Sequence, residues 1–274
     1  MPARPLCVLL PGFDGSGRLF EPLLARGMLP FEPCVIALPG DAPRGYDGLV
    51  AWVEGQLSAE PFVHVNWAKG IDKTTGRPIE DPSKRPQLNK WARNVCPNLF
   101  GGKNWEPMSY SMQTGLVYIP SFNLCMDIAG KNEEYEAGKF YLASEFDLDQ
   151  ADSGGYLAEL MAWDPVKQQR VWGIKEDLPI LGGAMTTAGN LMFYGNTRGI
   201  VKAADAKTGD ILWKFSVGSG ILQSPITYMV DGKQYLAVVA GRSKGPPSFL
   251  GKIGQRIIDA SPEGGILAVF ELGN

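Results

Sequence analysis

A short turn motif recurs along the chain, and it restricts the fold more than any other feature. Its clearest copy runs from Ala203 to Trp213 and reads AADAKTGDILW. In such a unit the Asp and Thr side chains can bond local backbone, Gly permits a positive φ, and Trp packs on a neighbour. Weaker copies lie at 70–76, 112–115 and 162–172. Hairpins that recur about every 40 to 60 residues are typical of a β-propeller.

The composition agrees with a turn-rich β protein. The 274 residues include 34 Gly and 21 Pro, with 45% hydrophobic and 20% charged residues. This balance is that of an ordinary soluble globular chain. A net charge of -3 argues against a nucleic-acid partner. No apolar run approaches the ~18 residues that span a bilayer, and no export signal is recognisable, so we expect no membrane contact and a cytoplasmic location.

Residues 1–61 predict a different kind of structure. Continuous apolar runs suit buried parallel strands, and leucines at helical spacing suit amphipathic helices. We expect, in order, a strand at 6–10, a helix over 19–24, a strand at 34–38 and a helix over 47–57. Cys7 and Cys34 then lie on the two strands and are most simply core residues. The order β-α-β-α predicts a short parallel α/β segment.

The turn after the first strand reads LPGFDG from Leu10 to Gly15. It resembles the turn that leads into the oxyanion loop of the α/β-hydrolase fold. By that resemblance, the backbone N–H of Phe13 or Asp14 would stabilise an oxyanion. Any tight β-to-α turn also favours glycine, so the motif is only moderately specific.

The nucleophile and base of a hydrolase are hard to find. One Gly-x-Ser-x-Gly match, at 241–245, contains Ser243, but two prolines follow and favour a chance match in a loop. Ser16 is the other weak nucleophile candidate. His64 is the one histidine and so the one available imidazole base. It sits in the alternating run FVHVNW, which predicts a half-exposed strand residue instead.

From Phe62 onward a second resemblance is much stronger. The residues that carry it are FVHVNWAKGID at 62–72, TGRP at 75–78, GGKNW at 101–105, TGLVYIP at 114–120, GGAMTTAGNL at 182–191 and the hairpin ending at Trp213. Together they resemble the C-terminal part of the pyrroloquinoline-quinone (PQQ) dependent alcohol dehydrogenases, the methanol and ethanol dehydrogenase quinoproteins. The resemblance implies a β-propeller and covers most of the chain.

That family passes a hydride from a primary alcohol to PQQ, with a carboxylate base and a calcium or lanthanide ion. Its base, metal ligands and ring-stacking Trp lie in a part of the propeller that this sequence does not match, so we expect an incomplete site without identifiable metal ligands. Asn104 and Trp105 match positions that contact the quinone. The alternative is that Trp105 is blade core and Asn104 caps a turn. Leu181 stands where some members carry an aromatic residue.

Two further features have alternative readings. Cys96 and Cys125 match positions that the family pairs as a structural disulfide; in a reducing compartment they would stay free as small buried side chains. The family is typically periplasmic. The acidic run at 145–152 could suggest calcium, but its alternation with Phe146 and Leu148 favours a strand that leads into a solvated loop.

The predicted fold is therefore mainly β, a partial propeller of about three and a half four-stranded blades after the α/β segment. We place a half blade at 62–79 and blades at 107–175 (with a long insertion), 183–217 and 223–271. The predicted domains are 1–61 and 62–274, joined by recombination of two truncated reading frames. An open ring leaves exposed edges, which a two-fold homodimer or the N-terminal segment would cover.

Three functions fit these observations. The first is a quinoprotein-type alcohol dehydrogenase scaffold with an incomplete site. The second is an esterase- or lactonase-type hydrolase of small esters, which rests on fold analogy. The third is a non-enzymatic propeller module that binds or assembles with other proteins.

Overall fold

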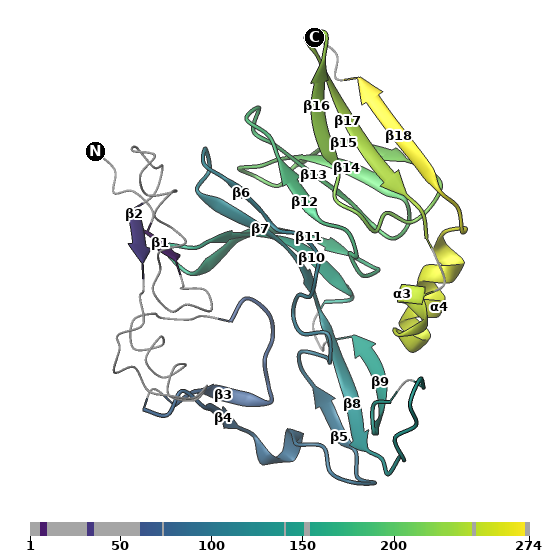
Figure 1. The fold of residues 1–274 in the computed structure, drawn as a ribbon. Coiled ribbons are helices and arrows are strands. Elements are labelled where there is room, and N and C mark those ends of the chain that lie inside the picture. Colours follow the sequence, from purple (N-terminus) through teal and green to yellow (C-terminus); the bar gives the residue numbers. More distant parts are fainter. Residues whose placement is uncertain are drawn as a thin grey trace. The chain divides into compact units, whose positions relative to one another are not determined.

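The computed structural model describes residues 6–9, 32–35, 61–72, 74–139, 141–150, 154–242 and 245–271 (Figure 1). The chain divides into two compact units. The first comprises 1–60, 70–79 and 165–168, and the second 61–69, 80–164 and 169–274. Strands in several antiparallel sheets dominate the described residues, which confirms the prediction of a mainly β chain. The predicted domain boundary between residues 61 and 62 stays a prediction.

In the first unit, two short strands pair in parallel. Strand β1 (Leu6–Leu9) runs beside β2 (Glu32–Val35), with Val8 opposite Cys34. The second strand begins two residues before the predicted 34–38, and residues 36–38 lie outside the described residues. Both predicted helices, over 19–24 and 47–57, lie outside the described residues, so the β-α-β-α order stays a prediction.

The turn at 70–76 has the form predicted from the repeat. Asp72 Oδ1 accepts hydrogen bonds from the backbone N–H groups of Thr74 and Thr75, at 2.8 and 3.1 Å. These bonds lower the pKa of the Asp72 carboxyl. Gly76 has a φ of 69°, which glycine adopts without strain. The turn connects β3 (Ala68–Ile71) with β4 (Pro78–Glu80), where the half blade was expected.

Three antiparallel sheets follow one another in the second unit (Figure 1). The first contains β6 (Ser109–Ser111), β7 (Leu116–Phe122), β10 (Ala158–Asp164) and β11 (Gln169–Glu176). The second contains β12 (Ala184–Thr186), β13 (Leu191–Gly195), β14 (Ile200–Asp205) and β15 (Ile211–Ser216). The third contains β16 (Ile226–Val230), β17 (Lys233–Ala240) and β18 (Ile266–Glu271). The second and third sheets fall within one predicted blade each, and the first extends one residue beyond its predicted blade, to Glu176. The third sheet has three described strands instead of the expected four.

The long insertion predicted within 107–175 forms a sheet of its own. Strands β8 (Leu124–Gly130) and β9 (Ser144–Gln150) lie between β7 and β10 in the chain, and β8 also pairs with β5 (Ala92–Val95). A short 3-10 helix, η2 (Pro82–Lys84), precedes β5. The acidic run at 145–152 begins on β9, where the sequence predicted a strand.

Tryptophans at the ends of hairpins pack between successive sheets. A buried cluster that includes Tyr118, Leu160 and Tyr194 joins the first sheet to the second, and Trp172 packs against it. Gly209 has a φ of 81°, and a Cβ there would lie 2.7 Å from the Trp172 ring. Trp213 meets Phe270 of the third sheet with ring centroids 5.1 Å apart. These contacts confirm the prediction that each Trp packs on a neighbour.

Two helices that the sequence reading missed follow β17. Helix α3 (Gly245–Ser248) contains Pro246 and Pro247, and α4 (Gly251–Ala260) follows it. The prediction of a loop after Ser243 is therefore wrong from Gly245 onward. The N–H groups of a first helical turn make no bond within the helix, so proline, which has no N–H, is tolerated there. Ile253 and Ile257 of α4 are buried in a cluster with Leu178 and Leu181.

The outer face of the third sheet is apolar and exposed. Its inner face packs on the second sheet through Leu236, Val238 and Ala240. On the outer face, the strand register places six exposed large side chains: Ile226, Tyr228, Val230, Val239, Leu267 and Val269. Apolar surface of this extent on one sheet is typical of an interaction face. The homodimer itself stays a prediction.

Among the described residues, no helix is both long and apolar enough to cross a membrane.

Candidate cofactor pocket

An apolar cavity of about 260 Å³ lies in the second unit. Its lining comes from the segment after β5, from β7 and β8, and from the α3–α4 region. The lining residues are Phe100, Asn104, Trp105, Phe122, Leu124, Leu181, Gly245, Phe249 and Leu250. Ligand sites are commonly lined by apolar and aromatic groups with a few polar ones, and Asn104 is the one side-chain amide of this lining.

Trp105 and Asn104 both face this cavity. Trp105 is 60% exposed, so it is not a blade-core residue as the alternative interpretation required. The Asn104 side chain donates from Nδ2 to the Phe100 carbonyl at 3.3 Å. Its backbone N–H donates to Glu106 Oε2 at 3.0 Å, and its carbonyl accepts from Lys103 Nζ at 2.9 Å. Neighbouring side chains thus fix the backbone of residue 104 on both sides.

Glu106 is the buried carboxyl group next to this wall. It has no exposed surface, and its Oε1 has no hydrogen-bond partner among the described residues. Burial raises the pKa of the Glu106 carboxyl, while the N–H of Asn104 and its own N–H oppose that shift. The charged form is therefore less favourable in the folded protein than in water.

We expect Glu106→Gln to change how stability depends on pH. The folded pKa lies above the unfolded one, so wild-type stability is highest below the unfolded pKa and falls as pH rises through the folded pKa. The variant carries no charge there, so its stability relative to the wild type should increase as the pH rises from 3.5 to 8. Urea unfolding of both proteins between pH 3.5 and 8 measures the difference. A difference that does not change with pH would contradict this role of the buried charge.

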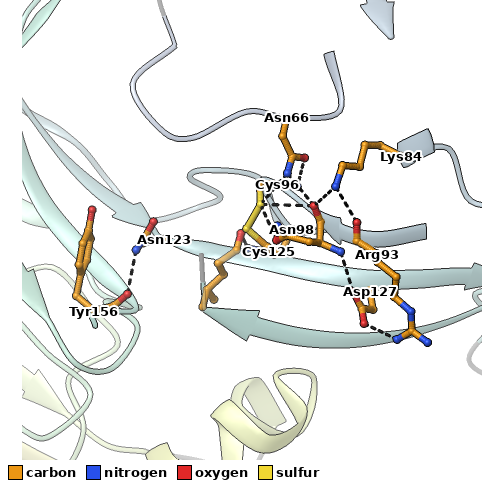
Figure 2. The surroundings of a disulfide bond; sticks show 11 residues. Asn66, Lys84, Arg93, Cys96, Asn98, Asn123, Cys125, Asp127 and Tyr156 are labelled. Atoms are coloured by element: carbon orange, nitrogen blue, oxygen red, sulfur yellow. Dashed lines mark hydrogen bonds and ion pairs between the residues drawn. A yellow bond between two sulfur atoms is a disulfide. The ribbon is translucent and has the colours of Figure 1, made fainter. Parts of the chain in front are cut away.

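The segment that carries Asn104 is anchored by a disulfide between Cys96 and Cys125 (Figure 2). Both cysteines are 1% exposed. The Cys96 N–H donates to Asn66 Oδ1 at 2.9 Å, and Asn66 N–H donates to the Cys96 carbonyl at 3.0 Å. Lys84 Nζ donates to the carbonyls of Arg93 and Asn94, at 2.9 Å each. The bridge thus sits in a well-bonded part of the insertion sheet.

His64 lies in a different cavity, also of about 260 Å³, which is more polar. The structure has no strand over 61–67, so the expected strand position of His64 is wrong, and the side chain is exposed. Glu159 and Arg170 line the same cavity and form an ion pair. Ser121 lines it too, but its hydroxyl donates to the Glu159 carbonyl at 2.9 Å.

The other hydrolase candidates cannot be placed relative to His64. Ser16, Ser243, Phe13 and Asp14 all lie outside the described residues. The structure thus brings Asn104 and Trp105 to one cavity, whereas the described serine in the lining of the His64 cavity, Ser121, donates its hydroxyl to the Glu159 carbonyl.

Metal ligands are not gathered in the described part of the chain. There, no group of three or more His, Cys, Asp or Glu side chains is arranged to hold a metal ion. On β9, Asp147 pairs with Lys252 at 3.1 Å and Glu145 pairs with Lys131 at 3.4 Å. These acidic side chains are ion-pair partners on an exposed strand.

Three aromatic residues of the cavity lining were not predicted from the sequence: Phe100, Phe122 and Phe249. Phe122 is the last residue of β7. Phe100 lies in a loop, and Phe249 lies between two helices that the sequence reading did not predict. The spacing of Leu250, Ile253 and Ile257 was the signal that would have revealed the second helix, since it places all three on one helical face. Phe249 and Trp105 are far apart in the sequence, and no local pattern predicts that they line the same cavity.

Comparison with known proteins gives this cavity a context. Residues 155–236 match the family model described as "Glucose/ethanol/alcohol dehydrogenase, beta-propeller domain". The chain is 39% identical over 234 residues to the lanthanide-dependent methanol dehydrogenase of Methylacidiphilum fumariolicum, covering 84% of this chain and 38% of that protein. It is 40% identical over 237 residues to the quinoprotein ethanol dehydrogenase of Pseudomonas aeruginosa, covering 84% and 38%.

The chain is also similar in structure to a solved dehydrogenase. The europium-containing methanol dehydrogenase superposes with a TM-score of 0.72 at 38% identity, over 78% of this chain and 41% of that one. The chain thus spans about 38% of the length of the curated relatives that it matches first. Most of this chain is therefore similar in sequence to PQQ-dependent quinoprotein alcohol dehydrogenases, and its sheets superpose on part of the propeller of one of them.

Proposed function

We propose that this chain provides part of the cofactor site of a PQQ-dependent alcohol dehydrogenase, with the cavity at Asn104 and Trp105 as one wall. The observation that carries the proposal is that both residues, matched to quinone contacts by resemblance, line one apolar cavity. The homology of most of the chain to quinoprotein dehydrogenases supports it. Because the chain spans only part of those relatives, activity of the whole protein belongs to the proposal as well.

The described lining fits the ring of PQQ better than its carboxylates. Phe100, Trp105 and Phe249 offer aromatic surface, and the Asn104 amide can donate to a quinone oxygen. The cavity volume of about 260 Å³ is just below the roughly 300–1,000 Å³ of complete ligand sites. Lys103 precedes Asn104 in the chain, and its ammonium donates a hydrogen bond to the Asn104 carbonyl. We infer a wall of the site, with the PQQ carboxylates held by residues beyond this lining.

PQQ, when bound, supplies the hydride acceptor for oxidation of a primary alcohol. In this chain, Trp105 and Phe100 would exclude water from one face of the ring. Asn104 would orient the quinone, because its backbone is already fixed by Glu106 and Lys103. The described residues do not fit a calcium or lanthanide ion, so no step is assigned to a metal.

The hydrolase-like segment, the binding module and the location of the protein each rest on a single observation. A hydrolase-like segment at 1–61 rests on the parallel pairing of β1 and β2, which an α/β start requires. A binding or assembly module would use the exposed face of the third sheet. The Cys96–Cys125 disulfide is typical of an oxidising compartment. We therefore propose the periplasm in place of the cytoplasm expected from the sequence.

Trp105→Ala should weaken PQQ binding about tenfold or more, because it removes the largest aromatic side chain of the lining. Asn104→Ala should weaken it less, by the loss of one polar contact. Isothermal titration calorimetry with PQQ measures both. The matched control is Trp91→Ala, since Trp91 is also exposed, at 37%, but does not line the cavity. Equal affinities for the Trp105 and Trp91 variants would exclude this cavity as the PQQ site.

Activity separates the three functions. Wild-type protein supplied with PQQ and calcium is tested for dye-linked ethanol oxidation and, in parallel, for hydrolysis of a p-nitrophenyl ester. Dye reduction without ester turnover supports the dehydrogenase, and the reverse supports the hydrolase. Silence in both assays together with PQQ binding by calorimetry would leave a cofactor-binding module that lacks the reacting groups.

A further inference from the structure

The wall of the cavity is built on a segment with no regular structure of its own. Residues 96–105 contain no helix or strand, yet Phe100, Asn104 and Trp105 all come from it. A loop that has no ladder of backbone hydrogen bonds depends on its anchors for a defined conformation. The precision of the cavity therefore depends on what holds this segment.

Besides the bonds between Cys96 and Asn66, three anchors connect the segment to β7 and β8. The Cys96–Cys125 disulfide fixes its start (Figure 2). Two residues on, the Asn98 N–H donates to the Leu124 carbonyl at 3.0 Å. Near its other end, the Gly102 carbonyl accepts from the Phe122 N–H at 2.8 Å. Phe122 and Leu124 also line the cavity, so these anchors hold both sides of it together.

Asn98 connects these anchors to the residues that line the cavity. Its side chain is buried, with the residue 4% exposed. Oδ1 accepts from the Phe100 N–H at 2.8 Å, and the Asn98 carbonyl accepts from the Gly101 N–H at 2.9 Å. The Phe100 carbonyl in turn accepts from Asn104 Nδ2 at 3.3 Å. A continuous set of contacts thus leads from the disulfide to the Asn104 amide.

We propose that the Cys96–Cys125 disulfide and Asn98 form a positioning clamp for the PQQ wall, so that reducing the disulfide weakens PQQ binding. Neither cysteine lines the cavity, so the clamp acts through Phe100 and Asn104 and not by contact with the cofactor. In the reduction, a dithiol gives two electrons and two protons and becomes a cyclic disulfide. The S–S bond breaks, and two thiols form. The inference rests on the proposed PQQ site.

The test compares the oxidised protein, the same protein reduced with dithiothreitol, and the Cys96→Ser/Cys125→Ser variant. Calorimetry should show PQQ affinity about tenfold weaker in the last two. The matched control is Cys7→Ser/Cys34→Ser, which removes the other two cysteines. This variant should bind PQQ with wild-type affinity before reduction and with about tenfold weaker affinity after it. Equal affinity of the oxidised and reduced wild type would refute the clamp.

A second readout needs no cofactor. Hydrogen exchange of the ligand-free protein should speed up at 98–105 on reduction, at least tenfold, but not in β13 and β14. Asn98→Ala should have the same local effect with the disulfide intact, and Asn98→Asp, which keeps the acceptor for Phe100, should largely restore protection. This arm keeps the test valid if reduction lowers overall stability. Failure of the oxidised protein to bind PQQ would reject the proposed function, whereas unchanged exchange at 98–105 would reject the clamp.

Discussion

Glu176→Ala is expected to destabilise the protein by about 3–5 kcal/mol, because it leaves a buried cation without its partner. The Glu176 side chain is 6% exposed and forms an ion pair with Lys202, whose side chain is 16% exposed. Its carboxylate also accepts from Tyr194 Oη at 2.6 Å and from Asn196 Nδ2 at 3.0 Å. Burial, and then the Glu176 charge, raise the pKa of the Tyr194 hydroxyl, so it stays a donor. Urea unfolding followed by circular dichroism measures the loss.

Two controls separate burial from charge in that experiment. Glu176→Gln keeps an acceptor for Tyr194 and should cost less than the alanine variant. Glu136→Ala removes a pair with Lys139 in which both side chains are more than half exposed, and it should change stability by less than about 0.5 kcal/mol. A Glu176→Ala loss below about 1 kcal/mol would show that the network does not hold the first two sheets together.

Tyr118→Ala is expected to cost a similar amount, about 3–5 kcal/mol, through the cavity that it creates. Tyr118 is fully buried between the first and second sheets, with its ring centroid 5.6 Å from that of Trp172. Its hydroxyl donates to the Ala206 carbonyl at 2.7 Å and lies 2.8 Å from Thr114 Oγ1. Thermal unfolding of the variant provides the measurement.

Tyr118→Phe isolates the hydroxyl from the ring. It keeps the packing against Trp172 and removes the bond to Ala206, so its expected cost is about 1 kcal/mol. If the phenylalanine variant lost as much as the alanine variant, the hydrogen bond to the neighbouring turn, and not packing, would be the main contact between these sheets.

The repeated turns were the part of the fold that the sequence predicted best, because their chemistry is local. Asp205 Oδ1 accepts from the N–H groups of Lys207 and Thr208, at 2.8 and 2.9 Å, and Gly209 takes its positive φ. These contacts need only residues within five positions of one another. Local turn chemistry therefore located the three sheets, although it overestimated the strands of the third.

The local sequence around the α4 helix gives conflicting signals, and tertiary packing decides between them. The spacing of Leu250, Ile253 and Ile257 favours a helix. Gly251, Gly254 and the preceding prolines all favour a loop locally. The helix forms where Ile253 and Ile257 are buried against Leu178 and Leu181, which come from the link between β11 and β12. The same long-range packing brings Phe249 to the cavity, so the local sequence contains no sign of that wall.

The residues of the candidate site also differ in how they could be predicted from the sequence. Asn104 and Trp105 were found by resemblance, and no local physical signal identified them as cavity residues. Glu106 was overlooked because a lone glutamate in a polar segment predicts exposure, whereas the residue is fully buried. Among the hydrolase candidates, the oxyanion turn and Ser243 were found by short motifs, and His64 was named because it is the one histidine. His64 is the single candidate that the structure describes, and it lies at a separate cavity.

The decisive measurement is a crystal structure of the oxidised protein grown with PQQ. The proposed function predicts the PQQ ring against Trp105, with a quinone oxygen within hydrogen-bond distance of the Asn104 amide. Density for PQQ at another place, with the cavity of Phe100, Trp105 and Phe249 empty, would contradict it.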